Sequence, residues 1–251
     1  MAQTHPTPPR RTRRWRLSWR GARPLAQFAL WAVLGLCGVV AIGVLVFGLW
    51  PGGALIAAVA VYGAGVLLAA LSLRHGFPHA TLGLCNAVTL ARLMAVAALS
   101  GALIAGVGMP WAVFTLAAFA LTLDGLDGWL ARREGRVSAF GARFDMEVDS
   151  ALALVLALLA WQGGSAGVIV LILGVPRYGF VLAGLALPWL AAPLPERFSR
   201  KVVCVLQLAV LIALQLPFVG GALGGALATV AALALIWSFG RDIALLWRAR
   251  R

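Results

Sequence analysis

Long apolar runs without a single charge limit the folds that this chain can adopt. The first run extends from Phe28 to Trp50, and similar runs follow along the 251-residue sequence, which is 62% hydrophobic. A helix of about 20 apolar residues crosses the hydrocarbon core of a bilayer, whereas a soluble domain is typically about 45–50% apolar. The sequence therefore predicts an all-α, polytopic membrane helix bundle and excludes a soluble domain.

Short segments rich in glycine and proline separate the runs and set their predicted boundaries. The segments from Trp50 to Gly53 and from Gly106 to Pro110 are two of them. The first run is too long for the apolar part of a cleavable signal peptide, which holds about 7–15 residues. Eight membrane spans are predicted, at about residues 28–50, 53–73, 83–106, 110–131, 145–162, 166–189, 201–219 and 223–246.

Positive charge predicts the topology. The chain has 21 Lys and Arg against 8 Asp and Glu, and nearly all of the basic residues fall in or beside segments 1–27, 74–82, 132–144, 190–200 and 247–251. Because basic loops stay in the cytoplasm, both termini are expected on the inner side of the cell inner (plasma) membrane. Topology and anionic lipids explain the charge better than nucleic acid. The tail itself is either an orientation signal or an interfacial segment.

Six of the eight acidic residues lie between positions 124 and 149. A carboxylate at membrane depth is costly unless it is paired or binds a metal. Asp124 and Asp127 are three residues apart, and Asp145 and Asp149 are four apart, so each pair shares one face of a helix. Carboxylate oxygens suit Mg²⁺, Mn²⁺ or Ca²⁺ rather than zinc or copper. The stretch therefore predicts a cation site.

The acidic stretch also follows the pattern D-x2-D-G-x2-A-R-x8-G-x3-D-x3-D. Its fixed positions are filled by Asp124, Asp127, Gly128, Ala131, Arg132, Gly141, Asp145 and Asp149. A second pattern upstream, N-x2-T-x2-R, is formed by Asn86, Thr89 and Arg92. Together these residues resemble the signature of the CDP-alcohol phosphatidyltransferase family (class I), whose members are integral membrane enzymes with a six-helix core.

The resemblance implies a division of the chain and a reaction. Residues 80–251 would form the family core, residues 28–79 two extra transmembrane helices, and residues 1–27 a basic cytoplasmic tail. In this family the hydroxyl group of an acceptor attacks the phosphorus of a CDP-activated alcohol, usually CDP-diacylglycerol, and CMP leaves. The implied partners are CDP-diacylglycerol, an acceptor alcohol, membrane lipids and a second copy of the chain in a homodimer.

The resemblance also assigns roles to the acidic residues. Asp124, Asp127 and Asp145 would hold one Mg²⁺ or Mn²⁺ ion, and Asp124, Asp145 and Asp149 would hold or approach a second one. Asp149 is the expected general base on the acceptor hydroxyl. Glu147 points away from the face of the aspartates, so it is expected to be a solvated interfacial charge.

Other motif residues are expected to bind the nucleotide or the rest of the substrate: Asn86, Thr89, Arg92, Gly128, Ala131, Arg132 and Gly141. The small residues among them would allow close approach of the substrate, and Arg132 would pair with a phosphate. Two interpretations of Arg92 remain open. Its side chain either assists a substrate phosphate or extends to the membrane interface.

Arg177 is the one basic residue deep within a predicted span, and such a residue indicates a functional site. Arg197, Arg200 and Lys201 lie at the start of the seventh span. All four could receive the phosphate of an acceptor such as glycerol 3-phosphate, although the last three could equally be positive-inside charges. Serine, choline and inositol phosphate remain alternative acceptors.

Two other functions are compatible with a membrane bundle. A transporter that binds a cation would place its acids near the bilayer centre and would use broken helices and an internal repeat, none of which is apparent in the sequence. An inactive scaffold fits poorly with a complete motif. Since the aspartates fall near the inner ends of the fourth and fifth spans, an active site facing the cytoplasm is predicted.

Overall fold

The protein is a bundle of helices. The computed structural model describes residues 22–50, 52–74, 77–135, 137–192 and 197–249, and all regular structure in these ranges is helical, which confirms the predicted all-α membrane bundle. Residues 1–21 of the predicted basic tail lie outside the described residues. The long helices are α1 (Ala22–Leu45), α2 (Gly53–Arg74), α3 (Leu84–Ala105), α4 (Pro110–Arg133), α5 (Ala139–Gln162), α8 (Phe198–Ala213) and α9 (Gly221–Ala249).

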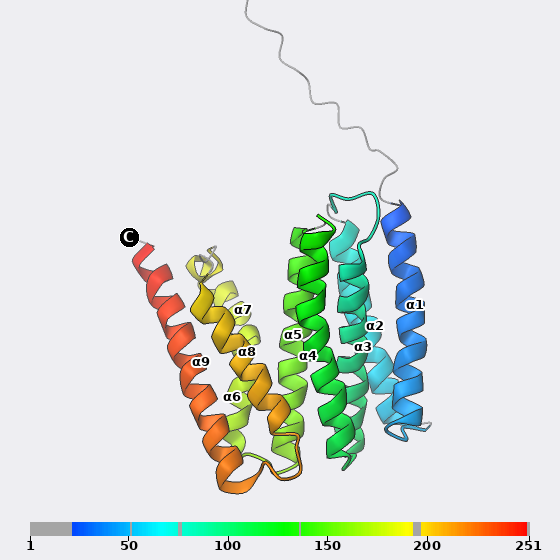
Figure 1. The fold of residues 1–251 in the computed structure, drawn as a ribbon. Helices are drawn as coiled ribbons and strands as arrows, with labels where there is room; N and C mark the ends of the chain where they lie inside the picture. Colours follow the sequence, from blue (N-terminus) through cyan, green and yellow to red (C-terminus); the bar gives the residue numbers. More distant parts are fainter. Residues whose placement is uncertain (1–21, 51, 75–76, 136, 193–196, 250–251) are drawn as a thin grey trace, which may run out of the picture.

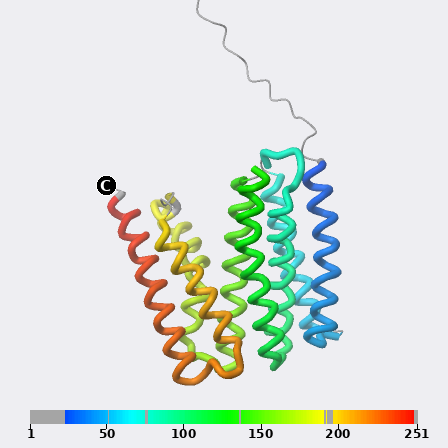
Figure 2. Tube along the Cα trace, viewed as in Figure 1, coloured from blue at the N-terminus to red at the C-terminus, as the bar shows by residue number. Residues whose placement is uncertain are grey.

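The helices run roughly side by side, with α5 between the group α1–α4 and the group α6–α9 (Figures 1 and 2). The start of α1 and the end of α9 lie at the same end of the bundle, together with the α2–α3 and α4–α5 connections (Figure 1). We call this the basic end, because Arg74, Arg132, Arg133 and Arg248 occupy the last turns of helices that finish there. Since the start of α1 and the end of α9 both lie at this basic end, the fold agrees with an even number of crossings (Figure 1).

Three of the long helices differ clearly from the predicted spans. The first runs from Ala22 to Leu45 rather than from residue 28 to residue 50. The fifth begins at Ala139 rather than at 145, because Ser138 caps its N-terminus by accepting a hydrogen bond from the backbone N–H of Gly141 at 3.0 Å. Asp145 and Asp149 therefore lie well inside α5 instead of opening it. The seventh helix ends at Ala213 rather than at 219.

The predicted sixth span is broken into short helices: η2 (Val168–Val170), α6 (Leu171–Gly174), α7 (Pro176–Ala186) and η3 (Pro188–Ala191). The segment Val168–Gly174, which contains η2 and α6, meets α7 at a bend of 63°. Proline lacks a backbone N–H and collides with the preceding turn, so Pro176 accounts for the break. Gln207 of α8 donates a hydrogen bond to the carbonyl of Leu173, a group that the break would leave unpaired. The expectation that no helix is broken was wrong.

Five described helices are long and apolar enough to cross a membrane, or six if the bent segment counts as one span. Eight spans were predicted. The difference comes from α5, which carries Asp145, Glu147 and Asp149, and from α8, which has only 16 residues. Both helices still lie within the bundle (Figure 1).

The first two helices pack on α3 at glycines. A Cβ atom at Gly65 of α2 would lie 2.8 Å from two carbons of Leu93, and one at Gly38 of α1 would lie 2.1 Å from the sulfur of Met94. Such distances are well below van der Waals contact, so a larger residue would force the Leu93 or Met94 side chain to move. The hairpin therefore presses on the stretch of α3 that directly follows Arg92.

Candidate functional site

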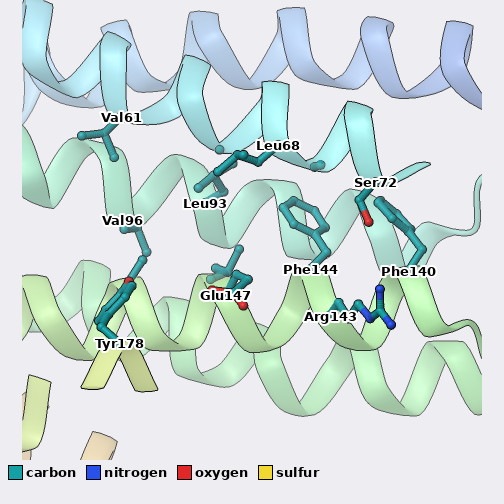
Figure 3. Close-up of a pocket in the computed structure, with 14 residues that line it drawn as sticks. Val61, Leu68, Ser72, Leu93, Val96, Phe140, Arg143, Phe144, Glu147 and Tyr178 are labelled. Carbon is teal, nitrogen blue, oxygen red and sulfur yellow. The ribbon is translucent and has the colours of Figure 1, made fainter. Parts of the chain in front are cut away.

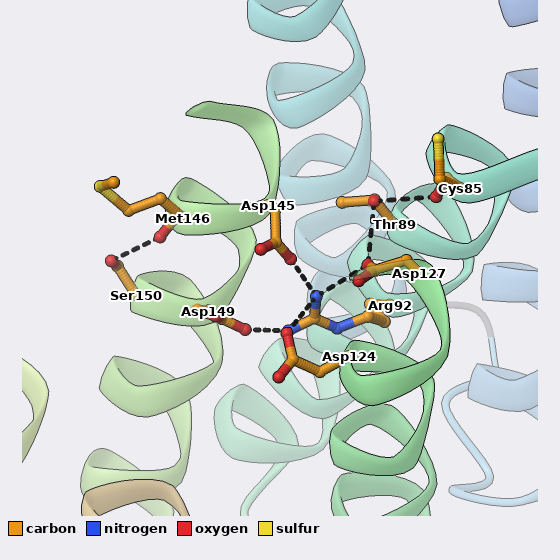
Figure 4. Close-up of polar contacts among 9 residues, drawn as sticks. All are labelled: Cys85, Thr89, Arg92, Asp124, Asp127, Asp145, Met146, Asp149 and Ser150. Carbon is orange, nitrogen blue, oxygen red and sulfur yellow. Dashed lines mark hydrogen bonds and ion pairs between the residues drawn. The ribbon is translucent and has the colours of Figure 1, made fainter. Parts of the chain in front are cut away.

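The four motif aspartates converge on one arginine. Asp124 and Asp127 project from α4, and Asp145 and Asp149 project from α5, toward Arg92 of α3 (Figure 4). The Nη1 atom of Arg92 lies 3.0 Å from Asp124 and 3.1 Å from Asp127, and it also contacts Asp145. The Nη2 atom contacts Asp149. Three helices thus bring together residues that are up to 57 positions apart in the sequence.

The cluster has more negative charge than Arg92 can balance. Four ionised carboxylates against one guanidinium leave three formal negative charges. The Nη1 atom has two protons but meets three carboxylates, so at least one of them lacks a proton to accept. Unbalanced charge of this kind is costly in a partly buried site unless a cation binds.

Three of the aspartates lie close enough together to hold a metal ion. An ion bound to all three would displace the Nη1 atom of Arg92, which contacts each of them. One carboxylate oxygen from each of Asp124, Asp127 and Asp145 lies within 4.8 Å of the others. Asp127 is buried, whereas Asp124 and Asp145 are partly exposed, so the group is open on one side. These are hard oxygen donors of the kind that Mg²⁺ and Mn²⁺ prefer. The residues therefore fit the predicted first ion, and Asp149 lies next to this group through Arg92.

Arg92 does not reach the membrane interface. Its side chain is completely buried, which rules out the interpretation that it extends to the interface. Its guanidinium contacts the four carboxylates in this structure and is not exposed to solvent. The arginine of the upstream motif is therefore part of the acidic site itself.

Thr89 and Asn86, the other two residues of that motif, are also buried. The hydroxyl of Thr89 lies 3.2 Å from a carboxylate oxygen of Asp127 and 3.1 Å from the carbonyl oxygen of Cys85. A hydroxyl has one proton, so it can donate to only one of them at a time. Thr89 thus contacts Asp127 from α3 and helps to hold its carboxylate in position.

Gly141 allows α5 to approach α3. A Cβ atom at this position would lie 3.4 Å from the side-chain oxygen of Asn86 and 3.2 Å from the hydroxyl of Ser138. On α4, Arg132 follows Gly128 by one turn, and its Nη1 atom would lie 3.5 Å from a Cβ there. Ala131 is partly buried beside them. The small motif residues therefore lie where neighbouring groups come close.

The predicted acceptor residues have partners that the sequence did not reveal. Arg177 lies in the first turn of α7, just after the break, and forms an ion pair with Glu147 of α5. Glu147 is exposed, as expected for a solvated charge, but it also has a basic partner that the sequence did not reveal. The Arg177 and Glu147 side chains keep 33% and 54% of their exposure, so the pair is accessible.

A second ion pair joins α8 to α9. Arg200 lies 3.6 Å from Asp242, a buried residue outside the sequence motifs. A lone acid within an apolar helix needs a partner, and that signal alone could have identified it. Arg197 directly precedes α8 and is partly exposed, whereas Lys201 is exposed in its first turn.

Comparison with known proteins adds one finding. Searches of curated proteins and of solved structures gave no match. A family model described as CDP-alcohol phosphatidyltransferase matches residues 82–239. This match covers more than half of the chain, includes both sequence motifs and leaves α1 and α2 outside. Together with the convergence of the motif residues on one site, it shows that the chain belongs to the CDP-alcohol phosphatidyltransferase family.

Proposed function

We propose that the protein transfers a phosphatidyl group from CDP-diacylglycerol to an acceptor alcohol during phospholipid synthesis. Family membership implies the coarser reaction, from a CDP-alcohol to an acceptor. The observation that carries the proposal is the group of three aspartates within 4.8 Å, with Asp149 beside it. In the reaction, the acceptor oxygen forms a bond to phosphorus, the bond from phosphorus to CMP breaks, and the acceptor proton passes to a base.

The aspartates have distinct roles in this proposal. Asp124, Asp127 and Asp145 would hold one Mg²⁺ or Mn²⁺, and Asp124, Asp145 and Asp149 would hold or approach a second. Bound ions of this type neutralise a pyrophosphate and stabilise the departing phosphate. Asp149, which contacts Arg92 beside this group, would accept the proton of the acceptor hydroxyl. Arg92 keeps the carboxylates together despite their mutual repulsion.

The remaining motif residues would bind the rest of the donor. Arg132 is exposed at the basic end, where its guanidinium can pair with a phosphate of the nucleotide. Gly128 and Ala131 leave room for the nucleotide beside α4. Thr89 would instead hold Asp127, and Asn86 and Gly141 would set the close approach of α5 to α3, because Asn86 and Thr89 are buried.

Glycerol 3-phosphate is the proposed acceptor, because a phosphate group would complement Arg177, Arg197, Arg200 and Lys201. We further propose a cytoplasmic active site at the inner membrane, a homodimer, and the division into residues 1–27, 28–79 and 80–251. The accumulation of arginine at the basic end supports this orientation.

A transporter is the second candidate, and the 63° break in the sixth segment favours it. One experiment separates the two functions. Purified protein in detergent is incubated with radiolabelled CDP-diacylglycerol, Mg²⁺ and a panel of acceptors, and released CMP is measured. Release that requires both Mg²⁺ and glycerol 3-phosphate is expected. Failure to release CMP with any acceptor, combined with cation uptake into proteoliposomes, would support the transporter.

A further inference from the structure

A cavity of about 420 Å³ lies between α2 and the core helices α3, α5 and α7 (Figure 3). Leu68 and Ser72 line it from α2, Leu93 from α3, and Arg143 and Phe144 from α5. The wall formed by α2 lies outside residues 82–239, so membership of the family assigns no role to this space.

The cavity is elongated along the helices and mostly apolar. It follows α2 from Val61 to Ser72 and α5 from Phe140 to Ala151, a length of about 16 Å at about 1.5 Å per residue. Leu68 is 69% exposed, so the cavity opens sideways toward the surrounding lipid. This shape suits a single extended hydrocarbon chain.

One end of the cavity carries an uncompensated positive charge. Figure 3 shows Arg143 and Ser72 near Phe140 at this end, which is the start of α5, and Val61 and Tyr178 at the other. Within the described part of the chain, Arg143 forms no ion pair or hydrogen bond. Glu147 also lines the cavity, but its charge is balanced by Arg177. The free charge at the cavity is therefore positive and lies at the basic end of the bundle.

The cavity is separate from the aspartate site. On α5, most lining residues, such as Arg143, Phe144, Glu147 and Ala151, lie roughly 150° around the helix from Asp145 and Asp149, at about 100° per residue, and only Val148 lies nearer to them. A donor whose pyrophosphate lies at the aspartates would have to pass around α5 to place its chain here. This position favours a different molecule as the occupant.

We propose that this cavity binds one acyl chain of an anionic glycerophospholipid of the bilayer, with the lipid phosphate at Arg143. An arginine at the headgroup level attracts anionic lipid, and its guanidinium can pair with a phosphate. Burial of a hydrocarbon chain against Leu68, Leu93 and Phe144 supplies the apolar contact. The lipid would fill the gap between the α1–α2 hairpin and α5, next to the helix that carries Asp145 and Asp149.

Photolabelling tests this lipid site. The full chain, purified in detergent, is incubated with phosphatidylglycerol that carries a photoreactive group near the end of one chain. Phosphatidylcholine with the same chain is the neutral probe. After illumination, peptides are mapped by mass spectrometry. We expect phosphatidylglycerol to label α2 near Val61 and Leu68, and phosphatidylcholine to label it much more weakly.

Two exposed arginines at the basic end provide matched variants. Arg143→Gln should reduce labelling of α2 about tenfold, the effect of losing one hydrogen bond to a charged group. Arg248→Gln, on the remote helix α9, should leave it unchanged. Equal labelling by both lipids, insensitivity to Arg143→Gln, displacement by excess CDP-diacylglycerol, or cross-links between two copies at α2 would each overturn the proposal. Labelling needs no catalysis, so it is independent of the transferase assay.

Discussion

Arg92 has an unusual environment, because it is completely buried and contacts four carboxylates. Removing one partner of a buried ion pair typically costs about 3–5 kcal/mol, since the other partner is left uncompensated. We expect Arg92→Ala to lower the thermal unfolding temperature in detergent strongly, and Mg²⁺ to restore part of the loss by neutralising the aspartates. Arg92→Lys should lie between, because it keeps the charge but lacks the planar fork. An Arg92→Ala protein as stable as wild type without Mg²⁺ would contradict this role.

Replacement of Asp124 tests the proposed metal site. Asp124→Ala removes a carboxylate from the three-aspartate group, so Mg²⁺-dependent release of CMP should fall to background. Glu147→Gln is the matched control, since it also removes one carboxylate from the region but lies outside the group. It should leave the Mg²⁺ requirement unchanged. Equal loss of activity in both variants would show that net charge, rather than ligand position, matters.

The ion pair between Arg177 and Glu147 allows the proposed acceptor site to be tested from both partners. If Arg177 binds the phosphate of glycerol 3-phosphate, then Glu147 competes with that phosphate for the same guanidinium. Arg177→Ala should raise the acceptor KM, by about 10-fold or more for the loss of a charge-assisted hydrogen bond. Glu147→Gln should lower it. The KM for CDP-diacylglycerol should change little in either variant.

Steady-state kinetics with each substrate varied in turn provides the measurement. Arg177→Lys should raise the acceptor KM less than Arg177→Ala does, because lysine retains the charge. If the ion pair only supports folding, both single variants should lose thermal stability and the acceptor KM should stay constant. That outcome would remove Arg177 from the acceptor site.

Helices α1 and α2 show how an added element can affect the site. Leu93 and Met94, which contact glycines of this hairpin, directly follow Arg92 on α3. Gly65→Ala would place a methyl group 2.8 Å from Leu93, an overpacking that typically costs about 1–3 kcal/mol. Gly63→Ala is the matched control, because nothing lies within 4 Å of a Cβ there.

Thermal unfolding of the two variants in the same detergent tests this packing. Gly65→Ala is expected to lower the unfolding temperature, and Gly63→Ala to leave it unchanged or raise it slightly, since alanine favours a helix. Equal behaviour of the two variants would mean that the hairpin packs on α3 less closely than the structure shows.

The sequence predicted elements well where one strong pattern controls them. Apolar runs placed α2, α3 and α4 within two residues of their observed ends, because a membrane span must satisfy its backbone internally. The early start of α5 depended on a cap at Ser138, a local hydrogen bond that hydropathy does not reveal. The break at Pro176 was missed because a proline can also be tolerated within a membrane helix.

Convergence of the aspartates could be predicted because helical spacing fixes which side chains share a face. The partners of charged residues could not be predicted, because pairs such as Arg177 with Glu147 and Arg200 with Asp242 depend on how helices pack. The central position of Arg92 has the same origin. Its sequence neighbours are apolar, and only the packing of α4 and α5 on α3 brings the carboxylates to it.

At the scale of the whole molecule, the distribution of charge makes the orientation testable. The α4–α5 connection lies at the basic end of the bundle, and the connection after α5 lies at the opposite end (Figure 1). Arginine-rich segments are retained on the cytoplasmic side. The aspartates, which lie toward the basic end on α4 and α5, should therefore be reached by a nucleotide from the cytoplasm.

Single cysteines in a background without Cys37, Cys85 and Cys204 can report this orientation. Val137→Cys precedes α5 and Gln162→Cys ends it, both at exposed positions, which avoids the neighbouring glycines with positive φ at 135 and 164. In intact cells, a membrane-impermeant maleimide should label Gln162→Cys, whereas Val137→Cys should be labelled only after the membrane is opened. The reverse pattern would place the basic end outside the cell, and a cytoplasmic CDP-alcohol could then no longer reach the aspartates.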